Sequence, residues 1–513
     1  MRLPSKLSFV SGHGFSRADS SPKMLRALAP ANWSCDLRTI LLASVCVSLA
    51  GCTAGPNYQR PSTPPAPPAY KELPPPNPPN GTWKPAQPSD AALKGKWWEI
   101  YNDTQLNDLE EKLTVSNQNL KASTQQYYEA REQVRVARAS YYPTLSAGPT
   151  IARQRTSDNQ PSATRGLTYN EFSLTGQVSW EPDLWGQVRR TVEQARANAQ
   201  ASAADLANVE LSLRSELALD YFELRGLDTQ KQLLDNTVSS DADYLQLTQR
   251  RFKGGVATEV DVAQAKTQLE QVRAQDIDVG VARAQYEHAI ATLIGVSASS
   301  FSLPPMPLTL ALPSIPAGVP SQLLERRPDI AAAERRTQAA NAQIGIAISA
   351  YYPNVTLGGS GGFASSQAGT WIQGPSALWS LGGSAVELLF DAGRRHALTA
   401  QSRDAYEAQT ANYRQSVLNA FQEVEDNLAA IRILSDEATT QNAAVVSSER
   451  SLNLSTTRYK GGVTTYLEVL TAQTTQLSNQ RTQADITTRQ FAASVQLIKA
   501  LGGGWDTSQL PQM

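Results

Sequence analysis

The stretch Arg251-Phe252-Lys253-Gly254-Gly255-Val256 returns later in the chain as Arg458-Tyr459-Lys460-Gly461-Gly462-Val463. The two copies lie 207 residues apart in a chain of 513. Residues 139–143 (Ala-Ser-Tyr-Tyr-Pro) and 349–353 (Ser-Ala-Tyr-Tyr-Pro) form a second matching pair at nearly the same separation. This period is far longer than the roughly 20–50 residues of stacked solenoid repeats. The sequence therefore predicts two copies of one structural plan.

Each Gly-Gly pair lies between two stretches of helical sequence. Residues 186–253 contain no proline, and they predict a helix on the order of 100 Å long. A shorter helix is expected at residues 258–293. The second copy repeats this pattern, with a long helix that ends at Lys460 and a last helix at residues 465–501.

The residues around each Gly-Gly pair predict how the chain turns between these helices. Glycine at positive φ commonly ends a helix, and a threonine followed three residues later by an acid commonly opens one. Thr258 and Asp261 fit the opening pattern after the first pair, and Thr465 and Glu468 fit it after the second. The sequence thus predicts two helical hairpins whose turns lie at one end of the molecule.

Strand-like alternation precedes each long helix. In the first copy the apolar face consists of Phe172, Leu174, Gly176, Val178 and Trp180. The expected order in each copy is helix (106–140; 321–350), strand (from 144; 355–363), strand (to 180; 378–390), long helix, Gly-Gly turn and helix. The copies span residues 96–302 and 321–502, with a Pro-rich linker at 303–320 and a tail at 503–513.

The first 51 residues have the pattern of a secretory signal. Arg38 precedes a short apolar run, which ends at Leu49-Ala50-Gly51-Cys52. This ending resembles a bacterial lipobox, in which the cysteine is lipidated and becomes the first mature residue; the alternative is a plain signal peptide with an incidental cysteine. Residues 52–95 would then be the lipid anchor and a Pro-rich tether. Thr53 follows the cysteine at the position where an aspartate would usually act as an inner-membrane retention signal. The outer membrane is therefore favoured.

Composition and motifs give no sign of nucleic-acid binding or of catalysis. The net charge is −1, and the basic residues are scattered. His288 and His396 are isolated on helical sequence without a second ligand at metal spacing. No Ser/His/Asp set or phosphate loop stands out. We expect no enzyme activity, no metal site, and no cofactor apart from a covalent lipid on Cys52.

The predicted elements require several copies of the chain. A helix of more than 60 residues needs lateral partners, and four strands cannot close a barrel in lipid without open edges. Three chains would supply twelve strands, enough for a closed barrel of pore size. The fold expected is therefore mainly α with membrane β: a homotrimeric α-helical barrel continuous with a 12-stranded transmembrane β-barrel, four strands per chain, built from a tandem repeat.

Several short motifs occur in an order that is specific in combination. They are the segments 55–61 (Gly-Pro-Asn-Tyr-Gln-Arg-Pro), Trp97-Trp98 with Asp103 and Leu106, residues 325–330 (Glu-Arg-Arg-Pro-Asp-Ile), the two Tyr-Tyr-Pro segments and the two Gly-Gly-Val turns. With them the chain resembles the TolC-type outer-membrane efflux proteins, in their lipoprotein branch, over practically all of residues 52–501.

The resemblance implies a passive trimeric duct in the outer membrane of a Gram-negative bacterium, lipid-anchored, with its helical barrel in the periplasm. Such a duct exports small molecules such as drugs, toxic compounds or metals. Its partners would be a periplasmic adaptor, an inner-membrane pump (with proton-driven favoured over ATP-driven) and outer-membrane lipid, and not nucleic acid. The alternative is a lipid-anchored periplasmic coiled-coil adaptor or interaction protein, but adaptors have a single helical hairpin set.

The resemblance also assigns roles to residues near the two turns. Gly254, Gly255, Val256, Gly461, Gly462 and Val463 would form the tips that dock the adaptor. Leu467 and Glu468 would narrow the periplasmic aperture, and Tyr459 and Arg458 would hold the tip by contacts between hairpins. Thr471 stands where the family often has a further acid, which puts strong cation selectivity in doubt. For Glu468, capping its own helix in solvent remains an equal alternative.

Overall fold

The computed structural model describes residues 53–72, 95–159, 165–315, 318 and 320–512. The expected signal segment, the Cys52 that is expected to carry a lipid, and part of the Pro-rich tether, residues 73–94, lie outside these described residues. The segment 96–302 contains α2 (Thr104–Ser116), α3 (Gln118–Ala139), β1 (Thr144–Arg155), β2 (Thr168–Trp180), α4 (Gln187–Lys253) and α5 (Glu259–Leu293). The segment 321–502 contains α6 (Leu323–Arg326), α7 (Pro328–Ser349), β3 (Asn354–Ser365), β4 (Ala377–Val386), α8 (Arg394–Lys460) and α9 (Tyr466–Ala500).

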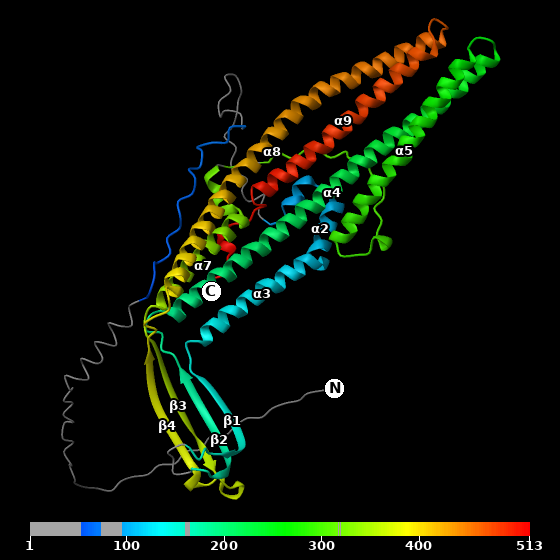
Figure 1. Ribbon diagram of the computed structural model, residues 1–513. Helices are drawn as coiled ribbons and strands as arrows, with labels where there is room; N and C mark the ends of the chain where they lie inside the picture. Colours follow the sequence, from blue (N-terminus) through cyan, green and yellow to red (C-terminus); the bar gives the residue numbers. More distant parts are fainter. Residues whose placement is uncertain (1–52, 73–94, 160–164, 316–317, 319, 513) are drawn as a thin grey trace, which may run out of the picture. The chain divides into compact units, whose positions relative to one another are not determined.

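The helices of the two segments correspond in length and position. The long helices α4 and α8 each have 67 residues, and α5 and α9 each have 35. At about 1.5 Å per residue each long helix extends on the order of 100 Å. Because β2 precedes α4 and the first Gly-Gly turn follows it, the sheet and the turns lie at opposite ends of the long helices (Figure 1).

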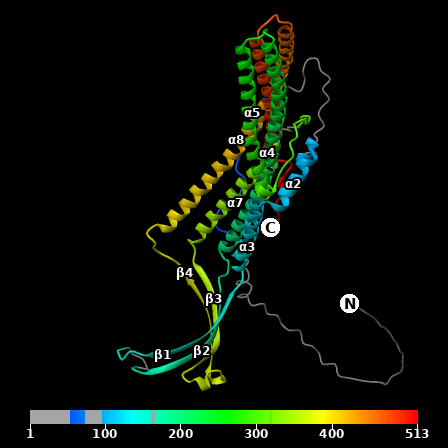
Figure 2. The same cartoon turned by 90° about the vertical axis from the view of Figure 1, so that its right-hand side faces the viewer.

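The four strands form one antiparallel sheet in the order β1-β2-β3-β4 (Figure 2). The register pairs Leu145 with Val178, Val178 with Gly359 and Gly359 with Leu381, so that these residues share one face. Alternation puts the apolar residues of β2 on this face, and it puts Ser146, Thr175, Ser360 and Ser380 on the other. The sheet therefore has one apolar and one largely polar face. Among the helices of the described residues, none is long and apolar enough to cross a membrane.

Three expected element boundaries were wrong. The helix expected at 106–140 is broken at Asn117, whose backbone is extended and whose amide donates to the carbonyl of Leu293 at 2.7 Å. The helix expected at 321–350 is interrupted at Arg327, because the residue before a proline is disfavoured in helical conformation. Strand β4 ends at Val386, before the expected Phe390. In the first two cases a local backbone feature overrides the hydrophobic pattern.

The N-terminal part of the described chain is held against the helices. The backbone of Ala54 donates to the carbonyl of Trp185, and Arg190 donates to the carbonyls of Ala54 and Gly55. Further along, the Tyr58 hydroxyl donates to Glu334 at 2.6 Å. Residues 53–55 therefore lie at the junction between the sheet and the start of α4.

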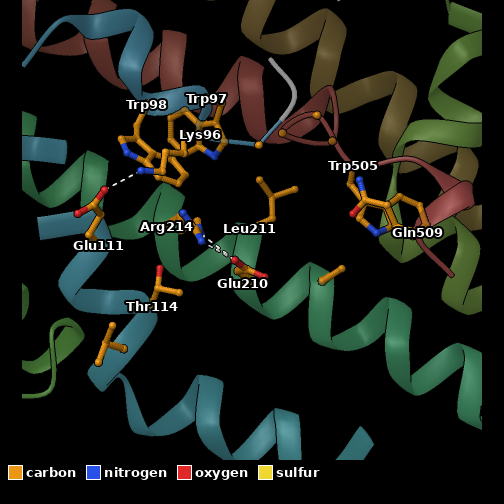
Figure 3. A pocket seen from close by; sticks show the side chains of 16 residues that line it. Lys96, Trp97, Trp98, Glu111, Thr114, Glu210, Leu211, Arg214, Trp505 and Gln509 are labelled. Carbon is orange, nitrogen blue, oxygen red and sulfur yellow. Dashed lines mark hydrogen bonds and ion pairs between the residues drawn. The ribbon is translucent and has the colours of Figure 1, made fainter. Parts of the chain in front are cut away.

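The main hydrophobic core lies where α2, α4 and α9 meet the short 3-10 helix Trp97–Tyr101. Beside it is a cavity of about 540 Å³, with walls that include Trp97, Trp98, Leu211 and Trp505 (Figure 3). Arg214 reaches into this region and stacks on the Trp98 ring at 4.2 Å while it pairs with Glu210. Both residues of the Trp pair are almost fully buried, so they belong to the core as well as to the cavity wall.

Glu110 is an ionisable residue within this core. It is fully buried, and neither carboxylate oxygen has a hydrogen-bond partner among the described residues. Burial raises the pKa of Glu110 well above its usual range; the charge on Arg214 opposes this effect and Glu210 adds to it. The spacing from Leu106 and to Leu113 places Glu110 on the apolar stripe of α2, and this was the signal available in the sequence.

We expect Glu110 to make the protein less stable as pH rises. The pKa of Glu110 is higher in the folded than in the unfolded chain. Its contribution to folding stability is therefore fully present below the unfolded-state pKa of about 4.5, and it is lost as pH rises through the folded-state pKa. The loss is at most about 1.4 kcal/mol per pH unit. Melting temperatures of the wild type and of Glu110→Gln between pH 4.5 and 8 should diverge with pH. The exposed neighbour substitution Glu111→Gln should track the wild type; if Glu110→Gln tracks it as well, the carboxyl is not buried as described.

Candidate functional site

The first Gly-Gly turn ends α4 with hydrogen bonds that require a positive φ. Gly255 has φ +76°, its backbone N–H donates to Phe252, and the N–H of Val256 donates to Arg251 at 2.9 Å. This pattern satisfies carbonyls that the helix end leaves free. Thr258 and Asp261 then form the expected capping box at the start of α5. Both local predictions for this turn are confirmed.

The second turn has the same backbone and a different start to the next helix. Gly462 also has φ +76°, and the N–H of Val463 donates to Arg458 at 3.0 Å. The side chain of Thr465, however, makes no capping hydrogen bond, so the expected capping box is wrong here. The Glu468 carboxylate instead lies 3.3 Å from the guanidinium of Arg458 on the preceding helix. An ion pair has replaced the cap.

The two turns present similar exposed apolar side chains. Val256 is 68% exposed and Val463 is 71% exposed, although valine is a residue normally buried. Neither carries a charge, and each directly follows a Gly-Gly pair. Each of the two matched hairpins thus presents one exposed apolar side chain at its tip.

Arg251 connects the first hairpin to the second. The Nη1 of Arg251, on α4, donates to the carbonyl of Tyr459 at 2.8 Å and to that of Lys460 at 3.2 Å. The same guanidinium lies 4.7 Å from the centre of the Tyr459 ring. Arg251 therefore donates hydrogen bonds to two carbonyls at the C-terminal end of α8, where a cation is favourable, and it also covers an aromatic ring. No role was predicted for Arg251 from the sequence, although this residue opens the repeated motif.

Next to the Arg251 contact, on the side away from the turns, side chains of all four hairpin helices pack together. Tyr459 is buried, with its hydroxyl 3.2 Å from that of Thr248, and its ring meets the Tyr466 ring edge-on at 5.6 Å. The Tyr244 hydroxyl lies 3.0 Å from that of Thr456. Of the two residues expected to hold the hairpins together, Tyr459 thus contacts the other hairpin, and Arg458 pairs with Glu468 of its own hairpin.

A buried carboxyl lies at the base of this contact. Asp241, on α4, accepts a hydrogen bond from the amide of Gln473 on α9 at 2.9 Å, and its other oxygen has no hydrogen-bond partner among the described residues. Burial raises the pKa of Asp241 to about 6, with a hydrogen bond to Gln268 acting in the opposite direction. The two hairpins are therefore joined through a buried carboxyl whose pKa is raised.

Leu467 and Glu468, expected at the aperture, both lie on the first turn of α9 and are exposed. They stand at the rim of a groove of about 380 Å³ between α8 and α9. The rest of the groove is lined by small residues, which are Ser448, Ser451, Ser455, Thr471, Ala472 and Thr475. Within the described part of the chain, no three His, Cys, Asp or Glu side chains gather where they could hold a metal ion.

The sequence matches the model of a family described as "Outer membrane efflux protein" over residues 109–296 and 319–503. It is similar to the "Probable efflux pump outer membrane protein TtgC" of Pseudomonas putida, with 30% identity over 472 residues that cover 90% of this chain and 95% of the relative. It is also 31% identical to "Outer membrane protein OprJ" of Pseudomonas aeruginosa, with the same coverage of both chains.

Solved structures agree with these relatives. The structure described as the open state of the Neisseria gonorrhoeae MtrE outer membrane channel matches with a TM-score of 0.76 at 27% identity, covering 88% of this chain and 98% of that one. The structure of the outer-membrane channel OprN matches with a TM-score of 0.77 at 28% identity, covering 88% of this chain and 100% of that one.

Proposed function

The chain belongs to the outer membrane efflux protein family, and on that premise we propose how its parts carry out export. It is the outer-membrane channel component of an efflux pump of Gram-negative bacteria. The family is a transport duct, and we assign no catalytic step to it. The finer proposal is a homotrimer with a covalent lipid on Cys52. Its hairpin tips would dock to a periplasmic adaptor, which connects it to an inner-membrane pump. A proton-driven pump is favoured. Its cargo would be drugs, toxic compounds or metals.

The geometry of the two tips supports the docking proposal most directly. Two turns of equal conformation end two hairpins of equal helix lengths, and each turn presents an exposed valine. An adaptor that met one turn could meet the other in the same way. Apolar contacts at Val256 and Val463 would supply affinity, while the glycine turns allow close approach of the partner's backbone.

The unpartnered faces of the chain support the trimer. The sheet of four strands has two open edges, β1 and β4, and its apolar face is exposed. Long helices of this kind need neighbours along their length. Three copies would pair the strand edges into twelve strands and place the helices side by side, with Leu467 and Glu468 of each copy at the aperture.

The position of residue 53 supports lipidation at Cys52. Thr53 lies against Gly186, at the junction of sheet and helices, and Ala54 is hydrogen-bonded to Trp185 there. A lipid on the preceding residue would start where a membrane-embedded sheet would leave the bilayer. We expect mass spectrometry of the mature N-terminal peptide to show an acylated Cys52, and Cys52→Ser to abolish acylation. An unmodified N-terminal peptide would contradict this expectation.

Photocrosslinking in cells tests the docking proposal. A photoreactive amino acid at Val256 or Val463 should capture the periplasmic adaptor, identified by mass spectrometry. Ile277 is a matched control because it is 76% exposed but lies 18 residues into α5, about 27 Å from the turn. Capture of the adaptor at Ile277 and at neither valine would show that the tips are not the docking site.

A further inference from the structure

A pocket of about 410 Å³ is lined by residues of α4 and α7 and by Tyr141, which follows α3. The helix α4 lies between α3 and α7 here (Figure 1). The lining includes three arginines, Arg189, Arg196 and Arg335, and one acid, Glu193. The pocket therefore has a net positive charge, which suits an anionic ligand.

The three arginines differ in how far the chain already uses their charge. Arg189 is paired with Asp183, with Nε 3.0 Å from the carboxylate. The Nε of Arg335 lies 3.4 Å from a carboxylate oxygen of Glu334, but it has no hydrogen-bond partner among the described residues. Arg196 is exposed, and no hydrogen bond or ion pair to another described residue occupies its guanidinium. Arg196 therefore offers a charge and several donors to a ligand.

The pocket lies on the side of α4 and α7 that also carries the first described residues of the chain. Its acid, Glu193, pairs at 2.7 Å with Arg190, which also binds the backbone of residues 54 and 55. On α7, Glu334 accepts from Tyr58 one helical turn away from a residue that lines the pocket. Because residue 52 is proposed to carry a lipid, this side of the helices faces the surface of the bilayer and not the lumen of the channel.

The pocket also adjoins the end of the sheet. The indole N–H of Trp180, the last residue of β2, donates to the carbonyl of Tyr141 at 3.0 Å. Trp and Tyr side chains are enriched where a membrane protein leaves the hydrocarbon and enters the headgroup region. Arg189 is the third residue of α4, and Arg196 lies about 10 Å further along the helix. Side chains of α4 are tilted toward its N-terminus, so both guanidinium groups are directed toward the sheet.

We propose that this pocket binds the phosphate group of an anionic phospholipid from the periplasmic leaflet. Arg189 and Arg196 donate to the phosphate oxygens, the hydroxyl of Tyr141 donates beside them, and Arg335 adds positive charge from α7. A headgroup without an amine is favoured, because the arginines repel an ammonium group. The inference rests on the proposed function only for the lipid on Cys52, which decides the side of the helices that faces the bilayer.

Native mass spectrometry of the full-length protein in detergent, titrated with phosphatidylglycerol or with phosphatidylethanolamine, tests the site. Phosphatidylglycerol should bind several-fold more tightly than phosphatidylethanolamine. Arg196→Gln should weaken the binding of phosphatidylglycerol about tenfold, since it removes a charged donor to the phosphate. Because Arg196 is exposed and pairs with no described residue, the variant should fold normally.

Arg403→Gln is the matched control. Arg403 follows Arg196 by 207 residues, so it is the equivalent arginine of the second repeat, and each is the tenth residue of its long helix. Arg403 is exposed as well, but it does not line the pocket. Its substitution should leave the affinity for phosphatidylglycerol unchanged. Equal affinities for the two lipids, no effect of Arg196→Gln, or equal effects of the two substitutions would overturn the proposal.

Inorganic phosphate separates a lipid from a soluble anion as the source of the phosphate group. We expect it to bind more weakly than phosphatidylglycerol, because it has no acyl chains to bury. Binding of inorganic phosphate that depends on Arg196, with no such binding of phosphatidylglycerol, would show that the pocket takes a soluble anion and not a lipid.

The Cys52→Ser protein separates this inference from the proposed function. Its affinity for phosphatidylglycerol should equal that of the wild type, because the substitution leaves the pocket unchanged. Binding that depends on Arg196 in a wild-type protein whose Cys52 is unmodified would overturn the lipidation and support the pocket. An acylated Cys52 in a protein that does not prefer phosphatidylglycerol would overturn the pocket and leave the proposed function in place.

Discussion

Replacement of Asp228 by alanine is expected to destabilise the protein by about 3–5 kcal/mol, the range found when one partner of a buried ion pair is removed. Asp228, on α4, is almost fully buried, and it accepts from Arg225 at 2.8 Å and from Arg283 at 2.7 Å. It also accepts from the backbone of Met306. Alanine would leave two guanidinium groups in a closed environment without their shared carboxylate.

This cluster also holds the linker between the two repeats. Arg225 donates to the carbonyl of Pro304 at 2.9 Å, and Arg283 donates to that of Leu303 at 2.6 Å. Loss of Asp228 would therefore leave two guanidinium groups without this carboxylate, and it would also weaken the contact of the linker with α4 and α5. We expect the variant to be depleted from the outer membrane or to melt at a much lower temperature.

Asp235→Ala is the matched control for this substitution. Asp235 also pairs with a base, Lys231 at 2.6 Å on the same helix, but both side chains are exposed to solvent. Exposed pairs contribute about 0–1 kcal/mol, so this variant should melt close to the wild type. Equal melting temperatures for the two variants would mean that the Asp228 cluster is hydrated.

The second large effect is expected in function without a loss of stability. Val256→Asp combined with Val463→Asp should reduce efflux to that of a strain lacking the gene. An unpaired carboxylate in a closed protein contact costs about 2–5 kcal/mol, and two of them would weaken docking by a factor of about 10³ or more. Because both valines are exposed in the chain, the amount of folded protein should not change.

Drug susceptibility and outer-membrane abundance should be measured together on this double variant. The control is Val256→Thr with Val463→Thr, which keeps the shape of the side chain without adding charge. We expect the threonine variant to retain most of the efflux activity. Normal efflux by the aspartate variant at normal abundance would exclude the tips as an adaptor contact.

The sequence alone predicted most of the fold, because its main signals are local. Helix length follows from an unbroken run without proline, and the turns at Gly254-Gly255 and Gly461-Gly462 follow from the positive φ that glycine tolerates. The alternation in residues 171–180 predicted a strand with one apolar face. The errors at Asn117 and Pro328 concerned helix boundaries. At each place the backbone conformation of one residue interrupts a longer helical pattern.

Tertiary structure decided what each side chain of the repeated motif does. Arg251 and Arg458 occupy the same place in nearly identical segments, yet Arg251 clasps the other hairpin while Arg458 pairs with its neighbour Glu468. In the same way, Asp228 looks like an ordinary solvated acid on a helix, and only packing buries it. Local sequence sets the backbone through short-range sterics and hydrogen bonds. Burial and pairing depend on which other segments pack nearby, and for Arg251 the partner carbonyl at Tyr459 is 208 residues away in the sequence.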